Sequence, residues 1–200
     1  MRKVITFLVL VLVLGCHQGK EPIVGETEFQ KKMNADFRDA TSSPLKGRAK
    51  KNFKGLDFFK FDSAYVVTAQ LKRTPDSKWF NMKTNTDRLS RERVYGVLTF
   101  DLQGQTYQLN VYQGEDSITS EDQQDYLFLP FLDNTNGETT YGGGRYIDLK
   151  IPEGDTIVVD FNKAYNPYCA YNENYSCPIV PRVNYLDTNI QAGVKAYKKE

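Results

Sequence analysis

The first pattern along the chain is an unbroken apolar run from Val4 to Leu14, which follows a short basic start. This run is too short to cross a hydrocarbon core, which needs about 20 residues in a helix. A basic start followed by a short apolar stretch is typical of a signal peptide, which the mature protein lacks. We therefore expect residues 1–15 to be a signal peptide that takes no part in the fold.

The end of this run, Val13-Leu14-Gly15-Cys16, resembles the bacterial lipobox, in which the cysteine is lipidated and becomes the mature N-terminus. Cys16 is then a diacylglycerol cysteine with a further palmitate chain, and several acyl chains together give stable anchoring. Residues 16–25 show no periodicity and are expected to form a flexible tether. The sequence thus predicts a lipoprotein of the bacterial cell envelope, and the outer membrane is the expected place of its anchor. The sequence does not determine whether the domain lies on the periplasmic face or on the surface face of that membrane. An ordinary signal peptide with a chance cysteine is the alternative.

The next stretch, residues 26–40, has the periodicity of a helix. Phe29, Met33 and Phe37 recur every four residues and would share one face. Thr27 is suited to cap the start of this helix, and Pro44 excludes helical geometry at the residue before it.

From Leu56 onward the apolar residues alternate with a period of two, which predicts strands separated by turns. The expected strands are 58–62, 65–71, 79–82, 93–102, 106–112, 125–132, 146–149 and 156–161. Gln103-Gly104 predicts a tight hairpin, and residues 152–155 predict another. These elements predict one mainly β (α+β) domain over residues 26–200: an antiparallel barrel or sandwich with an N-terminal helix and a short C-terminal helix.

Composition supports this class, because 200 residues suit one domain and 13 Tyr with 12 Phe favour sheets. The formal net charge is +1, which argues against nucleic-acid binding. The basic residues clustered between 46 and 54 suggest either a solvated face or a patch for an anionic lipid surface.

Candidate chemistry gathers between Tyr141 and Pro181. Gly142-Gly143-Gly144-Arg145 could cradle an anion with backbone N–H groups and a guanidinium. The alternative is a tight loop that needs positive φ, with Arg145 paired to Asp148 or Asp160 on a neighbouring strand.

A second polar group follows at Asp160, Asn162, Tyr165 and Asn166, where carboxylate, amide and phenol groups could orient a polar ligand. The structural alternative is that Asn166 caps the turn before Pro167 while Asp160 forms an ion pair. The full set of candidate ligand-binding residues is Tyr141, Gly142, Gly143, Gly144, Arg145, Asp148, Asp160, Asn162, Tyr165 and Asn166.

Cys169 and Cys177 would most simply form a disulfide in an exported protein, with buried free thiols or a metal or catalytic role as alternatives. The single histidine, His17, lies in the tether, so histidine-based catalysis and most metal sites are excluded. We expect no metal and no cofactor. Asp148 with Asp160 is the one carboxylate pair that could run glycoside chemistry.

Several blocks together resemble the domain of unknown function 1684 family, whose prokaryotic members are often lipoproteins. They are Ser43-Pro44-Leu45, residues 53–59, Thr139 to Leu149, Asp160 to Pro167, Cys169-Ala170, Cys177-Pro178, Asn184 and Ala192-Gly193. The resemblance covers about residues 30–198; Tyr168 departs from it, standing where a proline or small residue is expected. It supports the extent of the domain and implies no reaction.

The sequence therefore predicts a lipid-anchored envelope protein that binds a small polar or anionic ligand or a partner protein. One alternative is a carboxylate-based hydrolase or lyase acting on glycans. A second is a structural assembly protein of the envelope.

Overall fold

The computed structural model describes residues 25–198, so the predicted signal peptide, Cys16 and nearly all of the tether lie outside the described residues. The strands are β1 (Val66–Arg73), β2 (Phe80–Lys83), β3 (Leu89–Leu102), β4 (Gln105–Gly114), β5 (Tyr126–Asp133), β6 (Arg145–Lys150), β7 (Thr156–Asp160) and β8 (Tyr185–Leu186). The α-helices are α1 (Glu28–Arg38), α2 (Gly47–Lys51) and α3 (Glu115–Thr119), and 3₁₀ turns cover 63–65, 161–163, 168–170 and 182–184.

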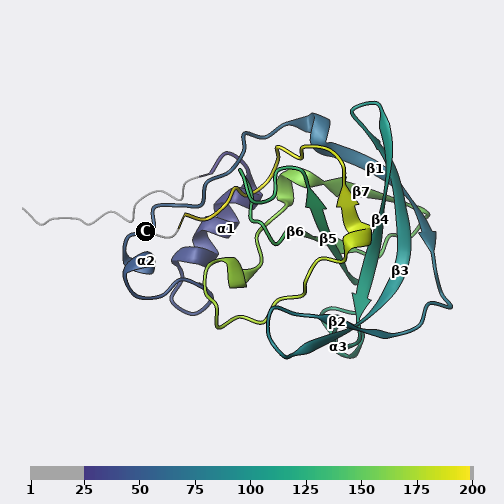
Figure 1. The fold of residues 1–200 in the computed structure, drawn as a ribbon, viewed down its shortest axis with the longest axis horizontal. Coiled ribbons are helices and arrows are strands. Elements are labelled where there is room, and N and C mark those ends of the chain that lie inside the picture. Colours follow the sequence, from purple (N-terminus) through teal and green to yellow (C-terminus); the bar gives the residue numbers. More distant parts are fainter. Residues whose placement is uncertain (1–24, 199–200) are drawn as a thin grey trace, which may run out of the picture.

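The strands form one curled, mainly antiparallel sheet with the order β6-β5-β4-β3-β1-β7. β2 pairs with β3, and β8 adds a short parallel pairing to β5. The sheet makes a half-barrel on one side of the molecule, while α1 and α2 gather on the other side (Figure 1). The predicted fold class is confirmed.

The inner face of the sheet carries the main core, to which each strand contributes alternate residues as the two-residue period predicts. On β6 these are Ile147 and Leu149, while Tyr146 and Asp148 point to the outer face. A smaller apolar cluster on the outer face joins Tyr112, Phe128 and Tyr146. Strand β6 is thus packed on both faces, with the aliphatic side chains of Ile147 and Leu149 on the inner face and aromatic side chains on the outer face.

The predicted N-terminal helix is confirmed as α1. The Thr27 hydroxyl accepts a hydrogen bond from the Gln30 backbone N–H, and the Gln30 side chain accepts one from the Thr27 backbone N–H. These two bonds complete a capping box. Phe37 is buried on the predicted apolar face, with Met33 packed beside it.

The Gln103-Gly104 hairpin is also confirmed. Both residues have positive φ, 52° and 80°, as a tight turn between β3 and β4 requires.

Three local predictions were wrong because their backbone groups pair with distant segments. Residues 58–62 form only a single bridge, from Phe58 to Val194. The loop at 152–155 is no hairpin, since β7 pairs with β1 and not with β6. The C-terminal helix is absent: Gly193 has φ +78°, and the segment runs extended to 198 with its amides bonded to three other segments.

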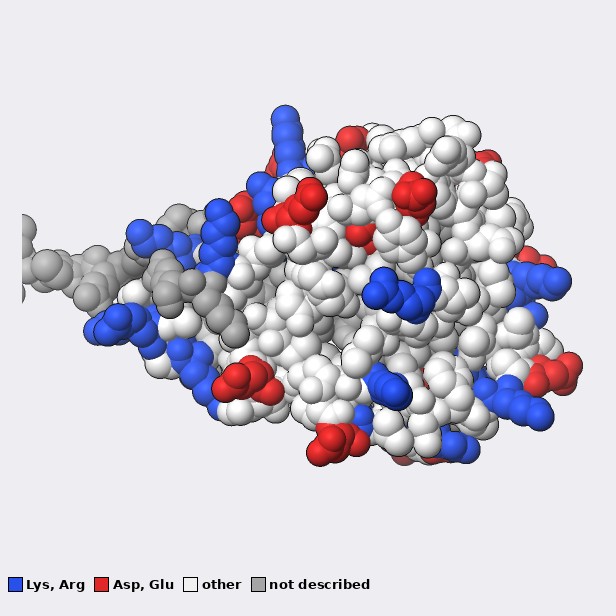
Figure 2. Space-filling view, in the orientation of Figure 1, with Lys and Arg blue, Asp and Glu red and all other residues white. Residues whose placement is uncertain are grey.

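The basic residues of 46–54 lie on an exposed part of the surface. α2 has no buried residue, and Lys and Arg side chains gather around it at one end of the face in Figure 2. In residues 25–198, none of the helices has the length and apolar character needed to cross a membrane.

Candidate functional site

Arg145 is fully buried on the inner side of β6 and forms an ion pair. Its Nη2 donates to Asp133 Oδ2 at 2.6 Å and to the Ile190 carbonyl at 2.8 Å, and Nη1 donates to the Ala192 carbonyl. Both partners of the ion pair are 0% exposed. Arg145 therefore ties the C-terminal segment to the sheet and presents no donor to an external ligand.

This placement corrects the anion-cradle hypothesis, because Nη1 and Nη2 donate to groups inside the protein, and the buried Nε, which has no hydrogen-bond partner among the described residues, is closed off from solvent. The structural alternative was right that Arg145 pairs with a carboxylate and wrong about which one. The partner is Asp133 at the end of β5, rather than Asp148 or Asp160.

The glycine run ahead of β6 is a turn, closed by a hydrogen bond from Gly144 N–H to the Tyr141 carbonyl. Gly144 has φ +88°, and a Cβ there would lie 2.7 Å from both the Phe131 carbonyl and Val180. A Cβ on Gly142 would have its nearest neighbour at 3.7 Å. Gly144 is thus required by the turn and its close packing, whereas Gly142 is not.

Asp160 and Asn162 also serve the fold. Asp160 caps the 3₁₀ turn at 161–163 through the Asn162 backbone N–H, and it lies 3.7 Å from Lys163. The Asn162 side chain donates to the Asp62 carbonyl and accepts from the Asp62 N–H. This pair clamps residue 62 to the end of β7, and Asp160 does not face Asp148 across a shared cavity.

Asn166 is 1% exposed and joins two segments. Its amide donates to the Lys195 carbonyl at 2.9 Å and to the Tyr171 hydroxyl at 3.2 Å. It therefore bridges to the C-terminal segment rather than capping the turn before Pro167.

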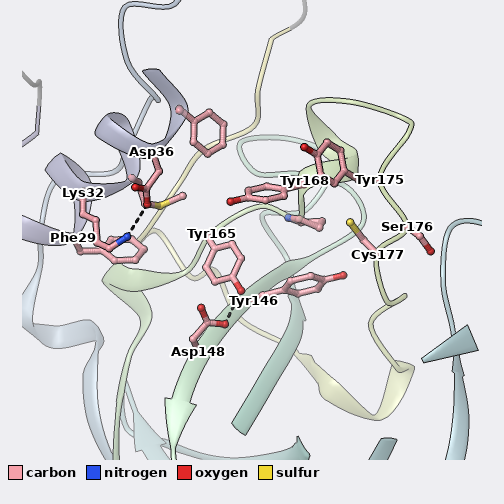
Figure 3. A pocket seen from close by; sticks show the side chains of 13 residues that line it. Phe29, Lys32, Asp36, Tyr146, Asp148, Tyr165, Tyr168, Tyr175, Ser176 and Cys177 are labelled. Atoms are coloured by element: carbon pink, nitrogen blue, oxygen red, sulfur yellow. Dashed lines mark hydrogen bonds and ion pairs between the residues drawn. The ribbon is translucent and has the colours of Figure 1, made fainter. Parts of the chain in front are cut away.

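Asp148 and Tyr165, by contrast, line a cavity of about 480 Å³ between α1, the outer face of β6 and residues 165–177. We call it the tyrosine pocket (Figure 3). Its walls are Phe29, Lys32, Met33, Asp36, Phe37, Tyr146, Asp148, Tyr165, Pro167, Tyr168, Tyr175, Ser176 and Cys177.

The Asp148 carboxylate is exposed in this pocket and held in place by two phenols. Its Oδ1 accepts from the Tyr165 hydroxyl at 2.6 Å and from the Tyr126 hydroxyl at 2.9 Å. Burial raises the pKa of both Tyr126 and Tyr165, and the negative charge of Asp148 raises them further. Both phenols therefore stay protonated and keep donating to Oδ1, which leaves Oδ2 open to a ligand.

The opposite wall of the pocket comes from α1. Lys32 donates to Asp36 at 2.7 Å along the helix, and this hydrogen bond raises the Lys32 pKa. The charge of Lys32 is therefore matched locally, and the pocket keeps one carboxylate without a cationic partner, that of Asp148.

The two cysteines lie side by side as free thiols, so the structure does not contain the predicted disulfide. The Cys169 backbone N–H donates to Cys177 Sγ at 3.3 Å, and the Tyr141 hydroxyl lies 4.0 Å from Cys169 Sγ. The hydrogen bond from Cys177 lowers the pKa of Cys169 to about 7, and the pKa of Cys177 is raised in turn. Burial raises the pKa of Tyr141 to about 12.

Sequence reasoning missed the aromatic walls of the pocket. The periodicity places Tyr146 on a strand and Phe29 on a helix face, and neither is among the candidate ligand-binding residues. Their convergence depends on how α1 and β6 come to border the same cavity, which no local pattern encodes. Among residues 25–198, no group of three or more His, Cys, Asp or Glu side chains could hold a metal ion.

Comparison with known proteins gives one family. The model of the family described as Protein of unknown function (DUF1684) matches residues 51–195. A similar solved structure is the solution NMR structure of an uncharacterized protein from gene locus rrnAC0354 of Haloarcula marismortui. The two proteins are 33% identical in sequence, and the match covers 83% of this chain and 89% of the Haloarcula marismortui chain. The TM-score between the two structures is 0.66. A search of curated proteins finds no match.

Proposed function

This chain belongs to the family described as Protein of unknown function (DUF1684), and we propose that it is an envelope lipoprotein whose tyrosine pocket binds a small, ring-bearing polar ligand. The observation that carries this proposal is the Asp148 carboxylate, exposed in an aromatic pocket and oriented by two phenols. Concave sites lined by aromatic rings with a few fixed polar groups are typical of small-molecule binding.

The geometry suits a ring with hydroxyl or amino substituents. The side chains of Phe29, Tyr146 and Tyr168 offer apolar surfaces on which a ring can pack. The free oxygen of Asp148 would accept a hydrogen bond from a substituent of that ring, and bonds to a charged group are the stronger kind.

The charge of the pocket narrows the ligand class. Lys32 is paired with Asp36, so an anionic ligand would meet Asp148 with no free cation to offset the repulsion. We therefore infer a neutral or cationic ligand, which replaces the anionic option suggested by the glycine and arginine residues.

Anchoring is the second part of the proposal and rests on residues 1–16 of the sequence. Cleavage before Cys16 and acylation there would tether the domain to the membrane of a bacterial envelope. Metabolic labelling with palmitate in a bacterial host tests this: the wild-type chain incorporates label, and Cys16→Ser does not. Equal labelling of both would refute the anchor.

The pocket is tested by a thermal-shift screen of the full chain against N-acetylglucosamine, glucosamine, acetate and phosphate. We expect a ring compound to raise Tm in the wild type and to lose most of this effect in Asp148→Asn. Asp76→Asn removes the same charge from an exposed turn and is the matched control. A shift caused only by acetate or phosphate, or one that persists in Asp148→Asn, contradicts the proposal.

A further inference from the structure

A second cavity of about 230 Å³ adjoins the tyrosine pocket on the outer face of the sheet, and Tyr146 and Tyr165 are walls of both. Its remaining walls are Glu92, Gly114, Ser117, Tyr126, Phe128 and Pro178. The sheet register explains this grouping, since Glu92 lies opposite Gly114 and Phe128 lies opposite both Tyr112 and Asp148. We call it the Glu92 cavity.

Glu92 is 6% exposed, and half of its carboxyl group lacks a partner. Oε1 accepts a hydrogen bond from the Ser90 hydroxyl at 2.8 Å. Oε2 is buried and has no hydrogen-bond partner in the part of the chain that the structure describes. Leaving such an atom unpaired is costly, so an unpaired carboxyl oxygen on a residue that lines a cavity needs a reason.

Gly114 provides independent support, because it lets the backbone approach the carboxyl group. A Cβ at this position would lie 3.3 Å from Oε1 and 3.4 Å from Oε2 of Glu92. Gly114 has no positive φ that would require glycine. The absence of a side chain here keeps open the space around the carboxyl group.

The neighbouring arginines form no salt bridge with Glu92 among the described residues, although three of them lie within five residues of it. Each is engaged elsewhere: Arg88 donates to Ser176 at 2.9 Å, Arg91 lies 3.5 Å from Glu115, and Arg93 donates to Gln113 at 2.7 Å. The walls of the cavity contain no Lys or Arg. The cavity walls thus supply no cation that could pair with the Glu92 carboxylate.

We propose that the Glu92 cavity is a subsite for an ammonium group of the ligand, and this inference rests on the proposed binding function of the tyrosine pocket. The rings of Tyr126, Phe128, Tyr146 and Tyr165 attract a cation through their π faces, and the Glu92 carboxylate pairs with its charge. At roughly 30 Å³ for each water-sized group, the cavity admits about seven heavy atoms, which is the size of choline.

Ammonium binding is linked to the protonation of Glu92. Burial raises the Glu92 pKa and nearby Asp116 adds to this, while the Ser90 hydrogen bond and Arg88 act in the opposite direction. An ammonium group favours the ionised carboxyl, so its binding releases a proton from the fraction of protein that is still protonated. Affinity for the cation therefore rises with pH as Glu92 ionises, and burial, the Ser90 hydrogen bond, Asp116 and Arg88 together set where that rise occurs.

The test compares choline with 3,3-dimethylbutan-1-ol, which has the same shape without the charge, by calorimetry on the full chain. We expect choline to bind the wild type at least tenfold more tightly, with an affinity that increases with pH. In Glu92→Gln most of this preference is lost, because only the aromatic rings still attract the cation, and the pH dependence disappears. Glu153→Gln, an exposed glutamate in the 152–155 loop, is the matched control and behaves as the wild type.

Equal affinity of the wild type for both probes overturns the subsite, as does choline binding that is undiminished in Glu92→Gln. The two proposals fail separately. If a neutral sugar depends on Asp148 while choline ignores Glu92, the tyrosine pocket stands and the ammonium subsite falls. If choline depends on Glu92 while ring compounds ignore Asp148, the cavity is a cation site without the proposed ring-binding pocket.

Discussion

The two faces of strand β6 differ in how their polar groups are used. Arg145 on the inner side is fully buried, and it bonds to one carboxylate and two backbone carbonyls. Asp148 on the outer face is exposed and held by two phenols, with one oxygen left open. Charge alone does not mark a functional residue on this strand. The useful criterion is whether a polar group keeps bonding capacity that a ligand in a cavity can reach, since the Nε of Arg145 also lacks a partner but is closed off inside the protein.

The same criterion separates the other candidates. Asn162 and Asn166 use their amide N–H groups to clamp distant segments, and Asp160 caps a turn. Asn166 Oδ1 is buried without a partner among the described residues, but Asn166 lines neither of the two cavities. Glu92, which the sequence did not single out, retains an unused oxygen beside a cavity.

Breaking the inner ion pair should have the largest effect. Arg145→Met leaves Asp133 buried without its partner, which costs about 3–5 kcal/mol of unfolding free energy in urea denaturation. The double variant with Asp133→Leu should recover most of this loss, because no buried charge remains. Lys150→Ala on the outer face, at an exposed ion pair with Asp125, should cost less than about 1 kcal/mol. Equal costs at positions 145 and 150 would show that the two faces do not differ.

The glycine turn before β6 gives a second matched comparison. Gly144→Ala forces a Cβ into contact with the Phe131 carbonyl at φ +88° and should destabilise the protein by about 1–3 kcal/mol. Gly142→Ala meets no close neighbour and should change stability by less than about 0.5 kcal/mol. Thermal or urea unfolding of the two variants measures the difference. Equal stability of the two would remove the structural role assigned to the turn.

High pH probes the phenols of the outer face. The folded-state pKa of Tyr126 and Tyr165 is raised above the unfolded value of about 10. Their contribution to stability is therefore fully present below pH 10 and is lost as pH rises from there towards the folded pKa. Tyr165→Phe should lose less stability than the wild type between pH 10 and pH 11. A loss identical to that of the wild type would show that Tyr165 does not titrate in this way.

The smallest expected effect concerns the thiols beside the pocket. In the reduced protein, iodoacetamide at pH 7 should alkylate Cys169 and leave Cys177 unmodified, since the Cys169 pKa is about 7 while that of Cys177 is raised. Peptide mass spectrometry gives the extent of modification at each site. Preferential modification of Cys177 would contradict the assigned hydrogen bond between the thiols.

Local signals in the sequence were enough for much of the fold. Thr27 with Gln30 forms a capping box, and Gln103-Gly104 specifies a tight turn, because both depend only on neighbouring residues. The hairpin predicted at residues 152–155 was wrong because the curl of the whole sheet pairs β7 with β1. The predicted C-terminal helix was wrong for the same reason, since Gly193 and its neighbours bond to residues far away in the chain.

For the site, the sequence identified the segment that contains it, but it did not separate the residues that line the pocket from those that serve the fold. The two-residue period of a strand separates position 145 from position 148, but it does not say which face is closed. That depends on Asp133, which lies at the end of β5, and on α1, whose residues line the pocket over the outer face. Glu92 carried no sequence signal, because a lone glutamate in a strand looks like any solvated residue until its burial is known.

The most direct test of the account is calorimetric titration of N-acetylglucosamine into the wild type and Asp148→Asn, with urea denaturation of both. We expect measurable binding to the wild type and at least tenfold weaker binding to the variant, with unfolding free energies within about 1 kcal/mol of each other. Undiminished binding to Asp148→Asn, or no binding to the wild type, would contradict the assignment of the outer face of β6 as the ligand-binding face.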